Sequence, residues 1–311
     1  MSLPKPRFGV IGTGAWARAV HMPAAAASSD VIFTSVFGRN AEALKIAAST
    51  HHIEAYQDLD AFLQSVEIVG IALPPELQPE FALAAAKARK HLLLEKPLAL
   101  DLPTARKIEE TLVANGLASV VFFPQLLSQD VGQWVAQTKA TGGWFAASLE
   151  RFSQALTDAR NPFHASDWRL DAGALWDTAP HAVALLLAVF GEFAEVIAVR
   201  GQGDLVSLTL VTGAGAIATL TLARDAMTPL PGKTMLFGSS GMKELPPTGN
   251  WNSLSIEAYQ TALCSLSAAA NGTLQKSLLY DARFAVQVTA VLAAAEASLK
   301  ERIVRIGPAL A

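Results

Sequence analysis

The residues best suited to chemistry in this sequence are a lysine, an aspartate and a histidine from two distant segments. Lys96 is the middle residue of a Glu95-Lys96-Pro97 triplet, and Asp177 precedes His181 by four residues. Histidine exchanges protons near neutral pH, and a nearby ammonium group stabilises negative charge that develops on an oxygen. This combination suits the interconversion of an alcohol and a carbonyl, in which a proton must leave or reach the reacting oxygen.

Each of these residues also has an ordinary structural explanation. Asp177 or Thr178 can cap a helix whose first turn contains Pro180. A histidine before an apolar run, such as His181, is often a core or capping residue, and an isolated Lys96 is usually a surface lysine. Asp177 and His181 share one helix face only if that first turn is helical.

A glycine-rich turn near the start of the chain predicts a dinucleotide site. Gly12, Gly14 and Ala17 fit the pattern G-x-G-x-x-G/A between a predicted strand and an Ala-rich helix. Gly12 permits the tight turn, Gly14 lets the backbone approach a pyrophosphate, and Ala17 allows the helix to pack closely on the strand. A glycine turn of another α/β fold is the alternative. The expected cofactor-binding residues of the turn are Gly12, Thr13, Gly14, Ala15 and Trp16.

The end of the second predicted strand bears on the choice of cofactor. Gly38 and Arg39 follow it, where an NAD site usually has an acidic residue that binds the ribose 2′-hydroxyl. A guanidinium can instead pair with a 2′-phosphate. The sequence therefore favours NADP(H) over NAD(H), unless Arg39 only stacks on adenine or is solvated.

The predicted elements divide into two patterns. In the first third, short apolar strands alternate with helices, which is typical of a parallel, doubly wound sheet. The predicted strands cover 7–11, 31–37, 67–72, 91–94 and 118–123, and the predicted helices cover 15–27, 41–50, 79–90 and 102–115. Further along, period-two alternation over 206–210 and 218–222 predicts an antiparallel hairpin, with 144–152 and 195–200 as its partners. Helices are expected over 256–270 and 280–301.

We therefore expect two domains. The first, residues 1–122, is an α/β Rossmann domain with a doubly wound parallel sheet that binds NAD(P). The second, residues 123–311, is an α+β domain with a large, mostly antiparallel open sheet.

Several motifs together resemble one known family. The glycine turn, Glu95-Lys96-Pro97 and the segment from Trp168 to His181 closely resemble the Gfo/Idh/MocA family, named for glucose–fructose oxidoreductase, inositol dehydrogenase and rhizopine catabolism. The resemblance covers nearly the whole chain, including the Leu73-Pro74-Pro75 turn. It implies hydride transfer at a nicotinamide without a metal, and a second domain that serves substrate binding and oligomer contacts.

The resemblance also implies roles for individual residues. Lys96 matches the lysine that hydrogen-bonds the reacting oxygen, and Pro97 matches a proline whose preceding peptide bond is often cis. His181 matches the general acid/base, and Asp177 matches the residue that orients the substrate or the histidine. The implied cofactor contacts beyond the glycine turn are Gly38, Arg39, Leu73, Pro74, Glu95, Lys96, Pro97, Trp168 and Arg169.

The sequence departs from the family pattern at three places. Gln78 lies where a histidine is common, 182–184 lacks an acid often found after the catalytic histidine, and 122–126 lacks an arginine. This loss of polar groups favours a smaller or less polar carbonyl or alcohol over a heavily hydroxylated sugar. Two further histidines are ambiguous: His21 lies near the cofactor or packs a helix, and His164 is a candidate for the border of the pocket.

Composition excludes several classes of protein. The chain of 311 residues is 51% hydrophobic and 16% charged with net charge −3, so it is neither disordered nor, without a Lys/Arg run, a nucleic-acid binder. Polar residues interrupt its most apolar stretches, so no membrane span is expected. No export signal is visible, and the only cysteine, Cys264, is expected to be a buried, inert thiol in the cytoplasm. Low charge also predicts a homodimer or homotetramer formed through the second-domain sheet.

The leading hypothesis is an NADP(H)-dependent oxidoreductase that acts on a small alcohol or carbonyl, with a sugar or cyclic polyol among the candidates. The alternative is a catalytically silent, cofactor-sensing regulatory protein with the same fold. The thinned polar pocket favours the alternative, whereas the retained Lys96, Asp177 and His181 favour the enzyme.

Overall fold

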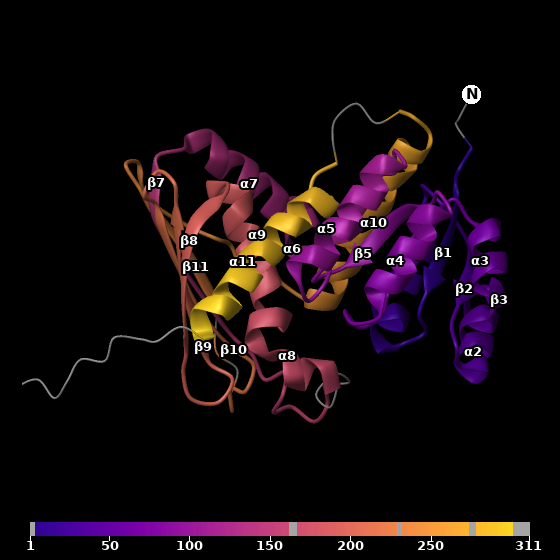
Figure 1. Ribbon diagram of the computed structural model, residues 1–311, viewed down its shortest axis with the longest axis horizontal. Coiled ribbons are helices and arrows are strands. Elements are labelled where there is room, and N and C mark those ends of the chain that lie inside the picture. Colours follow the sequence, from indigo (N-terminus) through magenta and orange to yellow (C-terminus); the bar gives the residue numbers. More distant parts are fainter. Residues whose placement is uncertain (1–3, 162–166, 229, 231, 274–277, 301–311) are drawn as a thin grey trace, which may run out of the picture.

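The computed structural model describes residues 4–161, 167–228, 230, 232–273 and 278–300. Two six-stranded sheets lie at opposite ends of the molecule, with helices packed between and around them (Figure 1). The candidate residue His164 falls outside the described residues.

The first sheet is entirely parallel and has the strand order β3-β2-β1-β4-β5-β6. Its strands are β1 (Arg7–Ile11), β2 (Ile32–Phe37), β3 (Glu54–Tyr56), β4 (Ile68–Ile71), β5 (His91–Glu95) and β6 (Ser119–Phe122). Every residue of β4 and β6 is buried, as expected for strands covered on both faces. This order confirms the predicted doubly wound Rossmann fold.

Helices cover both faces of this sheet, and side chains at their starts explain where they begin. The helices are α1 (Met22–Ala26), α2 (Ala41–His51), α3 (Leu59–Ser65), α4 (Gln78–Lys87) and α5 (Leu102–Ala114). Asn40, Asp58 and Asp101 precede α2, α3 and α5, and each side chain accepts a backbone N–H three residues later. The helix predicted over 15–27 is present, but its centre, Ala17–His21, widens into a π-helical turn.

The second sheet is open and mostly antiparallel, as predicted, with the order β12-β11-β7-β10-β9-β8. Its strands are β7 (Trp144–Phe152), β8 (Phe193–Arg200), β9 (Val206–Thr212), β10 (Ile217–Ala223), β11 (Lys233–Gly238) and β12 (Gly241–Glu244). The predicted hairpin is β9 with β10, where Leu208 faces Leu220. Both predicted partners are confirmed: β8 pairs with β9, and β7 pairs with β10, the latter in parallel.

Helices cover one face of the second sheet and leave the other bare (Figure 1). The remaining helices are α6 (Pro124–Leu127), α7 (Gln129–Thr141), α8 (Asp167–Asp177), α9 (Ala179–Phe190), α10 (Trp251–Ala270) and α11 (Ala282–Lys300). Leu208, Leu210 and Leu220 face the helices and are fully buried. On the opposite face, which no described element covers, the exposed apolar residues are Ile197, Val199, Ile217, Phe237 and Met242.

The two long C-terminal helices join the sheets. α10 packs on the first sheet, where Tyr259 and Leu263 belong to the same buried cluster as Phe8. α11 packs between α5 of the first layer and β8 of the second sheet. The carboxyl ends of the first sheet's strands are therefore held next to the second half of the chain.

The structure bears on two expectations drawn from composition, the burial of Cys264 and the absence of a membrane span. Cys264 is exposed on α10, so its expected burial is wrong, although partial burial and nearby Asp30 raise the pKa of its thiol and disfavour the thiolate. The segments Asp167–Phe190 and Ala282–Lys300 are long and apolar enough to span a membrane by composition. In the fold, 78% of the most apolar 18-residue window of the first segment is buried and its helix is interrupted at Gly173, so it packs as a core element.

Candidate active site

Lys96 and Asp177 meet where the two halves of the chain adjoin. Lys96 follows β5 at the carboxyl edge of the first sheet, and the Lys96–Pro97 peptide is cis. Its Nζ donates to the backbone oxygen of Asp177 at 2.7 Å and to Oδ1 at 3.2 Å. Because an ammonium has three donors, one N–H remains for a further acceptor.

The carboxylate of Asp177 is the centre of a buried ion cluster. Arg169 Nη1 donates to Oδ1 and Oδ2 at 3.0 and 2.9 Å, and Arg224 Nη1 donates to Oδ2 at 3.2 Å. Burial opposes ionisation, but the positive charges of Lys96, Arg169 and Arg224 hold the pKa of Asp177 far below its ordinary value. Asp177 is therefore a fixed carboxylate at any physiological pH.

The helix-capping interpretation of this segment is wrong. α9 begins after Thr178, whose side chain makes no capping hydrogen bond, and the Asp177 carboxylate is occupied by cations. Pro180 does lie in the first turn of the helix, as the sequence indicated. Asp177 itself ends α8, so a change of helix separates it from His181.

His181 lies in the first turn of α9 beside Trp251, the first residue of α10. Its Nδ1 is buried and has no hydrogen-bond partner among the described residues. The ring packs edge-on against Trp251 at 5.8 Å between centroids. Burial, followed by the positive charges of Lys96 and Arg151, lowers the pKa of His181 well below its ordinary value. The imidazole is therefore neutral near pH 7 and is able to accept a proton.

A second carboxylate anchors the arginine that supports Asp177. Arg224 is 1% exposed and donates from Nε and Nη2 to Asp204 at 2.7 and 2.9 Å. Its Nη1 also donates to the backbone oxygen of Arg169 at 2.6 Å. These contacts fix the end of α8, and the sequence analysis missed them because neither residue belongs to a recognisable spacing.

Gln78, which departs from the family pattern, braces the lysine turn. Its Oε1 accepts the N–H of Glu95 at 2.7 Å, and its Nε2 donates to the backbone oxygens of Glu95, Pro97 and Leu98 at 2.8–3.2 Å. Both halves of the amide are used, so Gln78 holds the backbone on either side of Lys96.

Glu95 contacts the helix that follows the glycine turn and, through His21, α10. Its Oε1 accepts from Trp16 Nε1 at 2.7 Å and lies 2.8 Å from His21 Nε2. The other ring nitrogen of His21 lies 3.0 Å from the hydroxyl of Tyr259 on α10. His21 is thus both buried and next to the predicted cofactor residues, and Tyr259 is a partner that sequence reasoning missed.

The glycine turn forms the wall of a cavity of about 250 Å³. At Gly12, where φ is 115°, an added Cβ would lie 2.4 Å from the backbone oxygen of Ala72. A Cβ added at Gly14 would have no atom within 4 Å, which leaves the backbone open to a pyrophosphate. The predicted residues that line this cavity are Gly12, Thr13, Gly14, Gly38, Arg39 and Leu73.

The other predicted cofactor residues lie outside that cavity lining. Pro74 is exposed after β4, and Ala15 begins the helix behind the turn. Trp168 stacks on the guanidinium of Arg169 at 4.8 Å, so both belong to the ion cluster around Asp177. The predicted residues thus include the cavity lining, the ion cluster around Asp177, and the hydrogen-bonded pair of Trp16 and Glu95.

An arginine from β7 contacts the segment 122–126, which has no arginine of its own. Arg151, near the end of β7, donates from Nη2 to Oε1 of Gln125 at 2.8 Å. Burial lowers the pKa of Arg151 to about 10, so the side chain is still charged at neutral pH. Arg151 belongs to no local pattern in the sequence, because only the fold brings it to Gln125.

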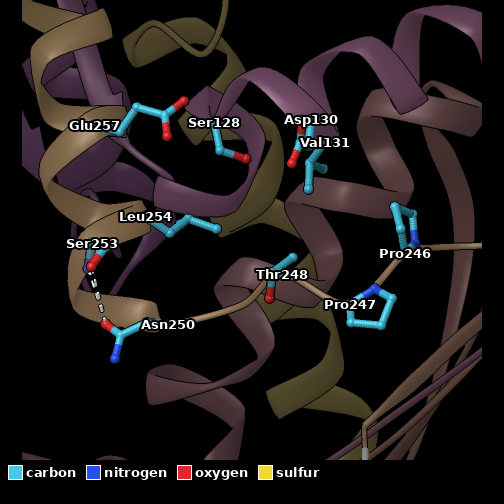
Figure 2. A pocket seen from close by; sticks show the side chains of 10 residues that line it. All are labelled: Ser128, Asp130, Val131, Pro246, Pro247, Thr248, Asn250, Ser253, Leu254 and Glu257. Atoms are coloured by element: carbon cyan, nitrogen blue, oxygen red, sulfur yellow. Dashed lines mark hydrogen bonds between the residues drawn. The ribbon is translucent and has the colours of Figure 1, made fainter.

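A second cavity, of about 210 Å³, contains none of the predicted site residues. Figure 2 shows it between the start of α7, the segment 246–250 and α10, with the carboxylates of Asp130 and Glu257 at its upper side. Asn250, which lines this cavity, directly precedes Trp251, the residue that packs on His181.

Comparison with known proteins agrees with this fold. Residues 6–123 match the oxidoreductase family with an NAD-binding Rossmann fold, and residues 149–244 match the GFO/IDH/MocA C-terminal domain. A solved structure of Lactobacillus casei myo-inositol dehydrogenase, in complex with NAD(H) and myo-inositol, superposes with a TM-score of 0.82. It covers 98% of this chain and 99% of that one at 20% identity, which is a likeness of fold.

Curated relatives match over part of their length. An uncharacterised oxidoreductase of Synechocystis sp. is 32% identical over 200 residues, covering 60% of this chain and 52% of the relative. The scyllo-inositol 2-dehydrogenase (NADP(+)) of Bacillus subtilis is 33% identical over 114 residues, covering 36% of this chain and 34% of the enzyme. The chain thus spans about half the length of the first relative. With both of its domain types matched in the expected order, the chain belongs to the Gfo/Idh/MocA family of oxidoreductases.

Proposed function

We propose that this protein is an NAD(P)-dependent dehydrogenase or reductase that acts on a CH–OH group of a sugar or polyol. The observation that carries the proposal is the meeting of Lys96 and Asp177, 3.2 Å apart, at the carboxyl edge of the Rossmann sheet, with His181 four residues after Asp177 in the chain. Ligands of open α/β sheets bind at that edge. The comparisons with known proteins give no support to the silent regulatory alternative.

The cofactor is proposed to be NADP(H) rather than NAD(H). Arg39 is exposed beside the cavity of the glycine turn, and no acid stands at the end of β2. A guanidinium pairs with a 2′-phosphate, whereas an acid at that place would repel it. The name of the Bacillus subtilis relative, which specifies NADP(+), is consistent with this choice.

Each of three residues has a defined role in the proposed mechanism. When bound, the nicotinamide supplies the hydride chemistry at the carbinol carbon. Lys96 directs its remaining N–H at the reacting oxygen and stabilises negative charge there. His181, neutral because of its burial and its cationic neighbours, takes the hydroxyl proton in oxidation. Asp177 keeps Lys96 charged and fixed, because the backbone oxygen and the carboxylate of Asp177 accept two hydrogen bonds from Lys96 Nζ.

The assembly and location follow from the same proposal. We infer that residues 123–311 bind substrate and form a homodimer or homotetramer through the bare sheet face, since large apolar faces rarely stay exposed. Residues 1–122 form the cofactor-binding part. The expected location is the cytoplasm, with a small-molecule substrate and neither nucleic acid nor membrane as a partner.

The test is an absorbance assay at the nicotinamide band with a panel of sugars, cyclic polyols and their oxidised forms. We expect turnover with at least one compound and tighter binding of NADPH than NADH by fluorescence titration. Cofactor binding without turnover on the whole panel would support the silent alternative instead, and clear preference for NADH would contradict the NADP(H) proposal.

A further inference from the structure

Arg151 of the second sheet lies on the face of β7 that otherwise carries buried apolar side chains. In β7, Ala147 and Leu149 are 4% and 1% exposed, and Arg151 is the next residue on that face because side chains alternate along a strand. Its neighbour on β10, Leu222, is fully buried. A charged side chain in such a position is destabilising unless its charge is compensated.

The residues that the structure describes do not supply that compensation. Nη2 of Arg151 donates to the neutral amide oxygen of Gln125, and the described part of the chain contains no ion pair between Arg151 and a carboxylate. The nearby Arg224, by contrast, pairs with both Asp177 and Asp204. Nε and Nη1 of Arg151 have no partner among the described residues, and the side chain keeps some exposed surface.

The positive charge of Arg151 also acts on His181, the proposed proton acceptor. Lys96, Arg151 and Arg169 lower the pKa of His181, and Asp177 raises it. Arg224 and Asp204 pair with each other and add one charge of each sign. Positive charges therefore prevail among the groups that act most on His181, which is where the proposed function places the substrate.

We propose that Arg151 binds an anionic oxygen group of the substrate, a carboxylate or a phosphate, and so selects acidic hydroxy compounds over neutral polyols. The inference rests on the proposed function, which puts the reacting hydroxyl at Lys96 and His181. A guanidinium presents a planar set of N–H donors that matches either oxyanion, and Gln125 holds one edge of it in place.

The test is calorimetric titration of the full-length protein, with and without NADP⁺, using matched acidic and neutral probes. Lactate is compared with propane-1,2-diol, D-glucuronate with D-glucose, and D-glucose 6-phosphate distinguishes phosphate from carboxylate. We expect at least one acid to bind about tenfold or more tightly than its neutral counterpart, as for a charge-assisted hydrogen bond. Arg151→Gln is expected to abolish this preference, and Arg151→Lys to restore only part of it.

A second variant guards against a folding defect in Arg151→Gln. Gln125→Glu keeps the shape of the side chain that faces Arg151 and gives the guanidinium an internal carboxylate. We expect this variant to lose the preference for acids while its melting temperature stays equal or rises. Gln133→Glu, on the exposed side of α7, is the matched control and is expected to leave the preference unchanged.

The outcomes separate the two proposals. If every acid binds no more tightly than its neutral counterpart, or if the preference survives both Arg151→Gln and Gln125→Glu, the inference is wrong. Absence of NADPH binding to the same protein would count against the proposed function alone, because the titrations without cofactor still decide whether Arg151 binds anions.

Discussion

The Nζ atom of Lys96 lies 2.7 Å from the backbone oxygen of Asp177 and 3.2 Å from its Oδ1, although 81 residues separate the two in sequence. This contact joins the Rossmann sheet to the helices of the second half at the proposed reaction centre. Burial lowers the pKa of Lys96, and the charge of Asp177 opposes that effect. The pairing therefore maintains an ammonium in a place where an isolated lysine would tend to lose its proton.

Removal of the lysine or the histidine is expected to stop chemistry without preventing cofactor binding. Lys96→Met and His181→Ala each remove a group that acts on the reacting oxygen, so kcat/KM is expected to fall by about 10²–10⁴-fold. The dissociation constant of NADPH, measured by fluorescence, is expected to change little. Lys107→Met, an exposed change on α5, serves as the control. Full activity of both variants on an identified substrate would contradict the assignment.

Arg39 is expected to determine the preference for NADP(H). Arg39→Gln removes the positive charge proposed to face the 2′-phosphate, so NADPH affinity is expected to fall roughly 10- to 100-fold. NADH affinity is expected to stay nearly constant, because NADH lacks that phosphate. Lys45→Gln, an exposed change on α2, controls for the general loss of a surface charge. Equal losses for both cofactors would assign Arg39 to adenine stacking instead.

The pH profile is expected to report the environment of His181. Its pKa lies well below the ordinary value, so the neutral base persists as the pH falls through 6.5. In the oxidation direction, the acid limb of kcat/KM is therefore expected below pH 6.5. Arg151→Gln removes a charge that lowers this pKa, so the limb is expected to move to higher pH. The surface control Arg106→Gln is expected to leave the limb unchanged. If the limb is also unchanged in Arg151→Gln, His181 is not the group whose titration the limb reports.

Gln78 is expected to stabilise the lysine turn. Gln78→Leu leaves one buried N–H and three backbone oxygens without their side-chain partner, so the free energy of unfolding is expected to fall by about 2–4 kcal/mol. Urea denaturation measures this change. Gln133→Leu, at an exposed position, is expected to change it by no more than about 0.5 kcal/mol. A loss no larger than that of the control would show that water replaces the glutamine.

The bare face of the second sheet is expected to be a subunit interface. Ile197→Glu places a charge on that face, where the wild-type side chain is 57% exposed, and is expected to dissociate the oligomer. Val113→Glu changes a residue of α5 that is 59% exposed and lies elsewhere, so it is expected to leave the assembly intact. Light scattering at micromolar concentration measures both, and a strictly monomeric wild-type protein would rule out the interface.

Local pattern was sufficient for most of the framework. The strand predicted over 144–152 is β7 without any change of bounds, and the alternation around 206–222 specified the β9–β10 hairpin. β3 was not predicted, because its three residues, Glu54–Tyr56, are too few for a periodic signal. Cys264 was misplaced because an Ala- and Leu-rich helix has an exposed face that composition does not reveal.

The sequence by itself determined most of the order of elements, the glycine turn and the choice of Lys96, Asp177 and His181 as candidates, because these depend on residues close together in the chain and on a family pattern. Only the tertiary structure decided their partners. Arg224 at the carboxylate of Asp177, Gln125 at Arg151 and Trp251 beside His181 all come from distant segments. Buried charges and amides are compensated by whichever groups the packing of helices on two sheets brings within hydrogen-bonding distance, and no local spacing encodes that choice.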